Sequence, residues 1–176
     1  MIRNAGISKG SLFQYFRNKE ELYFYVLDCV IQELTEYLEP GSKALPEELF
    51  DRIIKYAELE FSWYIRNPEK GRLIIDASAG KDTAVCQKVE ERYRLKGRDI
   101  YDSLLEDIDV SMLSGDKQKT ADILKWFLKG FNEDFNTRIS PQEDMDFSSL
   151  QHDYVKSLSD YMELLKSGIL TGEKGR

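Results

Sequence analysis

The feature that most constrains this chain is a helical spacing of apolar residues that runs nearly from one end to the other. Two segments show steps of three or four residues: about 117–138 at Ala121, Leu124, Leu128, Phe131 and Phe135, and about 147–167 at Tyr154, Leu158, Tyr161 and Leu165. Side chains at this spacing share one face of a helix. No sustained alternation of apolar and polar residues and no Asn-Gly or Asp-Gly hairpin turn occurs. We therefore expect an all-α fold.

Capping residues and breakers divide the first forty residues into two helices. Ser8 is a favourable N-cap for a short helix over about 8–16. Asn18, followed three residues later by Glu21, forms a near capping box that begins a long helix over about 19–39. Pro40-Gly41 is expected to end that helix. Residues 1–40 thus form a partial head with a connecting helix.

The rest of the chain, residues 45–176, is predicted to form one larger helical bundle. Pro46 suits the first turn of a helix that runs to about Arg66, and Asn67-Pro68 breaks it. The apolar pattern predicts further helices over about 69–78 and 82–108 before the two C-terminal segments. The fold expected is a helical head joined to an antiparallel helical bundle.

Charge is distributed unevenly along the chain. The formal net charge is −7, yet residues 1–19 contain Arg3, Lys9, Arg17 and Lys19 and no acid. The remainder therefore carries −11, which is −7 minus the +4 of the first segment. An acidic body repels nucleic acid except where the short basic segment can dock. The sequence therefore places any DNA contact at the N-terminal end.

The basic segment has the residue types that a DNA-reading helix needs. Ser8 caps the short helix, whose N-terminal amides and Lys9 favour a phosphate, and Gly10 permits close approach of a backbone. Leu12 and Phe16 lie four residues apart and hold the helix on its support. The side chains between them, including Gln14 and Tyr15, can face outward, as the second helix of a helix-turn-helix requires.

The run Ala-Gly-Ile-Ser-Lys-Gly-Ser-Leu-Phe-x-Tyr-Phe-x-x-Lys-Glu-Glu-Leu, from Ala5 to Leu22, resembles the signature of the TetR family of bacterial regulators. The resemblance covers about Ile2 to Val26. It implies that DNA is contacted by Ser8, Lys9, Gly10, Gln14, Tyr15 and Lys19. By this analogy, Gln14 reads a base edge, whereas Lys9 and Lys19 hold phosphates.

One departure from the family pattern concerns the start of the chain. Family members usually carry about thirty further residues before this point, a first helix and most of a second. We interpret the chain as N-terminally truncated near the end of that second helix, through a start codon assigned too far downstream. If the chain does begin at Met1, the alternative function is a dimeric small-molecule sensing module without DNA binding.

The two C-terminal segments are apolar on two faces, which predicts a partner as well as a core. We expect a homodimer whose interface uses the seam residues, at spacings typical of helix-on-helix packing: Leu124, Leu128, Phe131, Phe135, Tyr154, Leu158, Tyr161 and Leu165. Gly130 within the first segment suggests a close backbone approach, because glycine there costs roughly 1 kcal/mol against alanine.

Aromatic residues are abundant in residues 45–176 and are compatible with a pocket for a small apolar or aromatic effector. The candidate ligand contacts are Trp63, Tyr93 and Phe127. No nucleophile–base pair, phosphate loop, dinucleotide motif or metal-ligand cluster is recognisable, so neither enzymatic activity nor a cofactor or metal is expected. Without an apolar signal core after Met1 or an eighteen-residue apolar run, the predicted location is the cytoplasm, with no membrane partner.

These observations predict a ligand-responsive transcriptional regulator. As a dimer it would bind operator DNA, with repression the family's commoner mode, and a small-molecule effector would release it.

Overall fold

The structure of this chain is a computed structural model that describes residues 14–79, 87–89, 91–92, 116–142 and 144–169. Its helices, in chain order, are α2 (Lys19–Ser42), α3 (Leu49–Arg66), α4 (Pro68–Ala79), α6 (Lys117–Ile139) and α7 (Phe147–Ile169). The described residues contain no strand, and the predicted all-α fold is confirmed. None of the helices in these ranges is long and apolar enough to cross a membrane.

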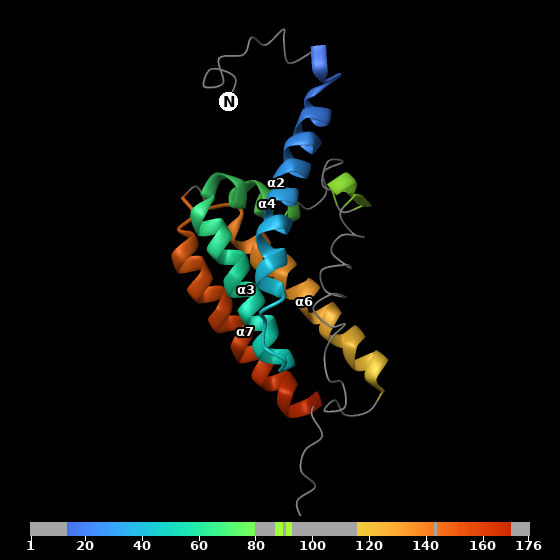
Figure 1. The fold of residues 1–176 in the computed structure, drawn as a ribbon, viewed down its shortest axis with the longest axis vertical. Coiled ribbons are helices and arrows are strands. Elements are labelled where there is room, and N and C mark those ends of the chain that lie inside the picture. Colours follow the sequence, from blue (N-terminus) through green and yellow to red (C-terminus); the bar gives the residue numbers. More distant parts are fainter. Residues whose placement is uncertain (1–13, 80–86, 90, 93–115, 143, 170–176) are drawn as a thin grey trace, which may run out of the picture.

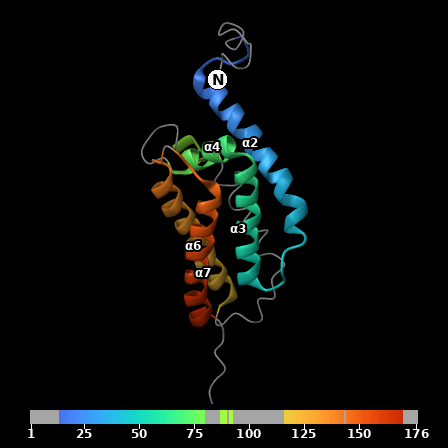
Figure 2. The same cartoon turned by 90° about the vertical axis from the view of Figure 1, so that its left-hand side faces the viewer.

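The long helix α2 joins the N-terminal end of the chain to the bundle. Its 24 residues correspond to a length of about 36 Å. In both views its first turns project beyond the other labelled helices, whereas the rest of α2 packs against α3 and α4 (Figures 1 and 2). The buried side chains recur every three or four residues along α2: Phe24, Leu27, Val30, Leu34 and Leu38. The helix therefore carries its N-terminal turns outward from a fixed base.

The C-terminal end of α2 lies three residues beyond the predicted position. The helix continues through Pro40 to Ser42, where the Ser42 hydroxyl donates to the Glu39 carbonyl at 2.8 Å. Proline this close to the end removes only one of the last helical hydrogen bonds. At Gly41 a Cβ atom would lie 2.4 Å from a Leu59 methyl carbon, so glycine allows α2 to end directly against α3.

α3 begins at Leu49 rather than at Pro46, because Glu48 is its N-cap and accepts a hydrogen bond from the Asp51 amide at 2.7 Å. It ends at Arg66, as predicted, before Pro68 begins α4. The corner between α3 and α4 is tight. A Cβ atom at Gly71 would lie 3.0 Å from both Tyr64 and Phe147, so this glycine allows the corner to pack under α7.

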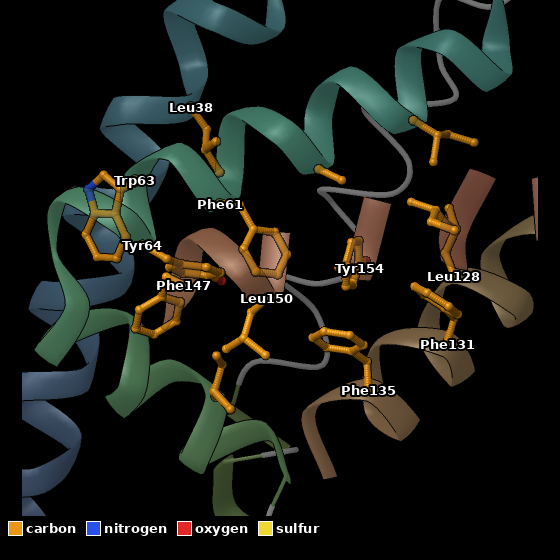
Figure 3. Close-up of a cluster of buried hydrophobic side chains, with 14 of the residues drawn as sticks. Leu38, Phe61, Trp63, Tyr64, Leu128, Phe131, Phe135, Phe147, Leu150 and Tyr154 are labelled. Carbon is orange, nitrogen blue, oxygen red and sulfur yellow. The ribbon is translucent and has the colours of Figure 1, made fainter. Parts of the chain in front are cut away.

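The C-terminal helices complete the core. α7 packs along α3, and α6 packs against α4. Their bounds agree with the predicted segments to within two residues. Aromatic rings from three helices gather between them, including Phe61 of α3, Phe131 and Phe135 of α6 and Tyr154 of α7 (Figure 3). These rings belong to the main buried cluster of the molecule, in which α3 meets the C-terminal pair.

A smaller apolar cluster lies at the projecting side of the bundle. It contains Phe24 and Leu27 of α2, Ala77 of α4 and Val89. Only residues 87–89 and 91–92 of the helix predicted over 82–108 are described, and they are helical. This cluster places α4 and residue 89 against the middle of α2.

Candidate nucleic-acid interface and its link to the body

The exposed end of the chain presents part of the predicted DNA-reading segment. Gln14 and Tyr15 are helical and exposed, and Tyr15 is 80% exposed. Of the other predicted contacts, Lys19 is exposed at the first residue of α2, whereas Ser8, Lys9 and Gly10 lie outside the described residues. The three described positions thus offer an amide, a phenol and an ammonium group to solvent at the projecting end of the molecule.

The chain changes direction between Tyr15 and Lys19 through a reciprocal cap. Asn18 is the N-cap of α2, and its side-chain oxygen accepts from the Glu21 amide at 2.8 Å. The Glu21 carboxylate accepts from the Arg17 amide at 2.6 Å. The capping box predicted from Asn18 and Glu21 is confirmed, with the return bond one residue earlier than in the standard motif. It defines the direction in which the preceding helix leaves α2.

An aromatic contact holds the end of that preceding helix on α2. The Phe16 and Tyr25 rings have centroids 5.2 Å apart. Phe16 is half-buried, as expected for the residue that supports a reading helix, whereas Gln14 and Tyr15 point away from this contact into solvent. The segment therefore has an anchored side and an exposed side.

The charges around this end are arranged to leave it positive. Arg17 and Lys19 are exposed, and the nearby Glu20 carboxylate forms an ion pair with Lys88. A paired carboxylate repels a phosphate less than a free one does. Cations at the projecting end can therefore attract DNA, although the chain as a whole is acidic.

Several charged contacts connect α2 to the rest of the molecule. Asp28 pairs with Arg92, and Glu33 of α2 pairs with Lys70 of α4. Near the base of α2, the Arg66 guanidinium lies 5.7 Å from the centre of the Tyr37 ring. These groups are partly exposed, so each contact is worth little in stability beside the buried apolar face of α2.

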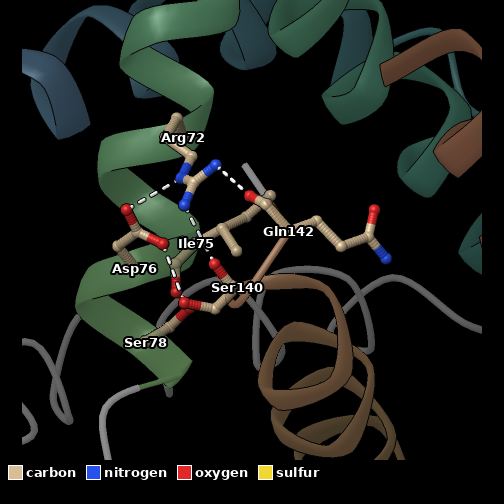
Figure 4. Close-up of polar contacts among 6 residues, drawn as sticks. All are labelled: Arg72, Ile75, Asp76, Ser78, Ser140 and Gln142. Atoms are coloured by element: carbon tan, nitrogen blue, oxygen red, sulfur yellow. Dashed lines mark hydrogen bonds and ion pairs between the residues drawn. The ribbon is translucent and has the colours of Figure 1, made fainter. Parts of the chain in front are cut away.

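A denser polar cluster, which we call the Arg72 clasp, joins α4 to the end of α6 (Figure 4). Arg72 pairs with Asp76 at 2.9 Å and donates to the Ser140 carbonyl at 2.9 Å and to the Gln142 carbonyl. The Ser140 hydroxyl donates to Asp76 at 2.8 Å. The carbonyls at the C-terminal end of α6 lack helical partners, so a guanidinium is a favourable group there.

The predicted ligand contacts occupy different environments. Trp63 is 4% exposed and lies beside Leu38 and Tyr64, on the side of α3 that faces α2 (Figure 3). Phe127 is half-buried on α6 and stacks on Phe131 with centroids 5.8 Å apart. Tyr93 lies outside the described residues. Among the described ring contacts, Trp63 meets Tyr64, whereas Phe127 meets Phe131 and Tyr161.

Most of the predicted interface residues are buried within the single chain. Leu124, Leu128, Phe131, Phe135, Tyr154 and Leu158 are each at most 8% exposed, and Leu165 is half-buried. Tyr161 is the exception at 50% exposure. Both seams therefore face the core of one chain, and any surface for a partner on these helices is formed by neighbouring residues.

Those neighbouring residues form an exposed apolar surface, which we call the α6–α7 patch: Ile123, Trp126, Phe127, Gly130, Tyr161 and Leu164. Trp126 is 72% exposed and Leu164 is 69% exposed. The Phe127 and Tyr161 rings, with centroids 5.7 Å apart, connect its two helices. The sequence indicated it only as apolar residues outside the seams.

Two polar features were not predicted from the sequence. A groove of 510 Å³ between α3 and α7 is lined by Glu58, Ser62, Ser148, Gln151, His152, Val155 and Lys156. In the interior, the Tyr64 hydroxyl donates to the Glu60 carboxylate at 2.6 Å. Burial is the main cause that raises the pKa of Glu60, and burial together with the charge of Glu60 raises the pKa of Tyr64. The sequence signal for this pair was an acidic residue, Glu60, at the edge of the apolar face of α3.

Comparison with known proteins agrees with the N-terminal motif. Residues 2–26 match the family model described as bacterial regulatory proteins, tetR family. No curated protein matches the chain. The matched residues contain the exposed Gln14, Tyr15 and Lys19 and the Asn18 cap that orients them. This match, which covers 25 of the 176 residues, supports a DNA-binding transcriptional regulator of the tetR family.

Proposed function

We propose that this regulator is a ligand-responsive repressor that binds operator DNA as a homodimer in the cytoplasm. The observation that carries the proposal is the projecting basic end of α2, with Gln14, Tyr15 and Lys19 exposed beside an anchored Phe16. Gln14 pairs with a base edge, and Lys19 holds a phosphate. Ser8, Lys9 and Gly10 complete the contact surface. Residues 1–40 act as the DNA-binding head and residues 45–176 as the sensing and dimerising body.

The proposed dimer forms through the α6–α7 patch, on the two helices for which the sequence predicts an interface. An exposed cluster of large apolar side chains is unfavourable in water and is typical of a protein interface. Seam residues such as Leu128 and Tyr154 support the patch from beneath, and Tyr161 contributes directly to the contact.

Gly130 gives independent support for a partner on this face. It lies in the middle of α6, is exposed, and has no described atom within 4 Å of where a Cβ would be. Glycine within a helix costs roughly 1 kcal/mol against alanine, and nothing described in the same chain uses the space. A second copy whose backbone approaches α6 there would use it.

The effector is proposed to bind within the body, near Trp63, Tyr93 and Phe127. Its binding favours a conformation in which the two heads are separated by a distance that does not match successive major grooves, about 34–36 Å apart. The helix contacts provide a route for this change: α6 packs on α4 through the Arg72 clasp, and α4 packs on α2. A shift at the dimer helices therefore moves the lever that carries the head.

Fluorescence anisotropy on DNA from the gene's own upstream region tests the proposal. The chain is measured as given and with any in-frame upstream codons restored, at two salt concentrations. Lys19→Ala should weaken binding and reduce its salt dependence, because one phosphate contact is lost. Lys43→Ala, at the opposite end of α2, is the matched control and should bind normally. Equal binding by the two variants, or no binding by either wild-type version, would refute the DNA-reading role.

A further inference from the structure

The two halves of α2 are supported differently among the described residues. The inner half contributes three side chains to the main buried cluster, in which α3 also takes part: Val30, Leu34 and Leu38. The outer half contributes Phe24 and Leu27 to the smaller cluster, where the other buried members are Ala77 of α4 and Val89. The described apolar support is therefore thinner towards the projecting end of α2, and polar contacts there have more influence on its direction.

Two complementary rows of side chains meet at this outer half. Glu20, Phe24 and Asp28 are spaced four residues apart and therefore share one face of α2. Lys88 and Arg92 are also four residues apart, and both are helical. A row of two acids and one aromatic ring thus faces a row of two bases from a part of the chain more than sixty residues away.

Every member of the two rows takes part in a contact between them. The Lys88 ammonium group pairs with the Glu20 carboxylate. The Arg92 guanidinium pairs with the Asp28 carboxylate and lies 5.4 Å from the centre of the Phe24 ring, so one planar cation spans a full turn of α2. Val89, which is 8% exposed, lies between the two bases in the sequence and adds an apolar contact to the same region.

The position of these contacts along α2 increases their effect on the DNA-reading segment. Asp28 lies nine residues after Lys19, which corresponds to about 14 Å along the helix. The Asn18 cap fixes the direction of the reading segment relative to α2, so a tilt of the outer half moves that segment as well. Each contact is weak in stability because its groups are partly exposed, yet a small free energy is sufficient to favour one direction of a helix over another.

We propose that Lys88 and Arg92, which we call the α2 brace, hold the outer half of α2 in the direction seen here. Resting on the function proposed above, they are positioning residues for DNA binding: they do not touch DNA, and they place the segment that does. Because DNA selects one direction of that segment, loss of the brace weakens binding by at most the free energy that the brace supplied to that direction.

Hydrogen exchange measured by mass spectrometry on the full chain without DNA tests the brace directly. In Arg92→Gln the backbone amides of residues 22–28 should exchange about three- to tenfold faster, because local opening of the outer half becomes easier. Lys70→Gln is the matched control. It also removes one positive charge from an ion pair with α2, but its partner Glu33 lies on the inner half, so exchange of residues 22–28 should not change.

Fluorescence anisotropy gives the second readout, with upstream DNA and whichever form of the chain binds it. Arg92→Gln should weaken DNA binding about three- to tenfold, whereas Lys70→Gln should stay within about twofold of wild type. Exchanging the charges, Asp28→Arg combined with Arg92→Asp, keeps the net charge and restores an ion pair. This double variant should recover most of the lost protection and affinity, whereas Arg92→Asp alone should show neither.

Circular dichroism checks the folding of each variant. Unchanged exchange of residues 22–28 in Arg92→Gln, an equal increase in Lys70→Gln, or no recovery in the exchanged pair would overturn the brace. The two readouts also separate this inference from the proposed function. If exchange responds as expected but no form of the chain binds DNA, the brace stands and the DNA-binding role fails. If DNA is bound and Arg92→Gln changes neither readout, the DNA-binding role stands and the brace fails.

Discussion

Replacing Trp126 with alanine should separate the protomers without unfolding them. Trp126 is 72% exposed in the single chain, so the substitution removes little from the core. A tryptophan residue buries roughly 200 Å², of which this exposed fraction is about 140 Å². At about 25 cal/mol/Å² its complete burial in an interface is worth at most about 3.5 kcal/mol for each protomer.

The entropy lost on association reduces this upper limit. We therefore expect each Trp126→Ala substitution at the interface centre to lower the binding free energy by about 2 kcal/mol. A two-fold symmetric dimer contains two copies, so the dimer should be weakened by about 4 kcal/mol, which is roughly a thousandfold in Kd. Sedimentation equilibrium over a concentration series measures this constant directly.

Ile65→Ala is the control for this experiment. Ile65 is 38% exposed on α3, outside the α6–α7 patch, and its removal should leave the dimerisation constant within about threefold of the wild-type value. A Trp126→Ala protein that dimerises as tightly as Ile65→Ala would refute an interface centred on this patch. Loss of the helical circular dichroism signal in Trp126→Ala would refute the claim that the side chain is dispensable for the fold of the single chain.

Four further substitutions test other parts of the argument. Gly130→Ala should stabilise the isolated protomer towards urea by up to about 1 kcal/mol yet weaken dimerisation, and stronger dimerisation would exclude a close approach there. Arg72→Met keeps the aliphatic stem and removes the clasp, so unfolding in urea should show a loss of about 2–3 kcal/mol; an unchanged midpoint would make the clasp dispensable. Asn18→Ala should lower the free energy of unfolding by about 1 kcal/mol. It should also lower DNA affinity, measured by anisotropy, because the DNA-reading segment is no longer held in its direction relative to α2; unchanged affinity would show that the Asn18 cap does not orient this segment. Because burial raises the pKa of Glu60, its contribution to stability is fully present below the ordinary glutamate pKa and is lost as pH rises through the folded value. Glu60→Gln should therefore gain in melting temperature over wild type as the pH is raised above the ordinary glutamate pKa, and a parallel pH dependence of the two proteins would contradict the burial.

The helical fold and its main boundaries were accessible from the sequence because local signals mark them. Asn18 caps α2, Asn67-Pro68 separates α3 from α4, and the start predicted at Lys117 agrees with the structure. Each of these depends on residues close together in the chain. The errors are equally local. A proline near the end of α2 was treated as a stop, and α3 begins at Leu49 rather than at Pro46 because the Glu48 side chain caps the Asp51 amide.

Features that depend on contacts distant in sequence were not accessible in this way. The Arg72 clasp joins residues about seventy positions apart, and the proximity of Tyr64 to Tyr154 requires α3 and α7 to lie side by side. Periodicity gives the face on which a side chain lies, but it does not say what covers that face. For the DNA-reading segment, the family signature indicated the function. Charge and helical spacing alone could not, because a short basic helix has several possible uses.

The C-terminal helices show why core and interface are difficult to separate from a pattern. Both kinds of surface exclude water and both repeat every three or four residues, so two apolar stripes on one helix are equivalent in the sequence. The structure distinguishes the two stripes by exposure: Leu124 and Leu128 are buried, whereas Ile123 and Trp126 are exposed. An exposed stripe that contains a glycine with no neighbour among the described residues is better explained by a second chain than by chance. On this argument the partner should approach α6 most closely at Gly130, and Trp126, one turn away, should dominate the affinity.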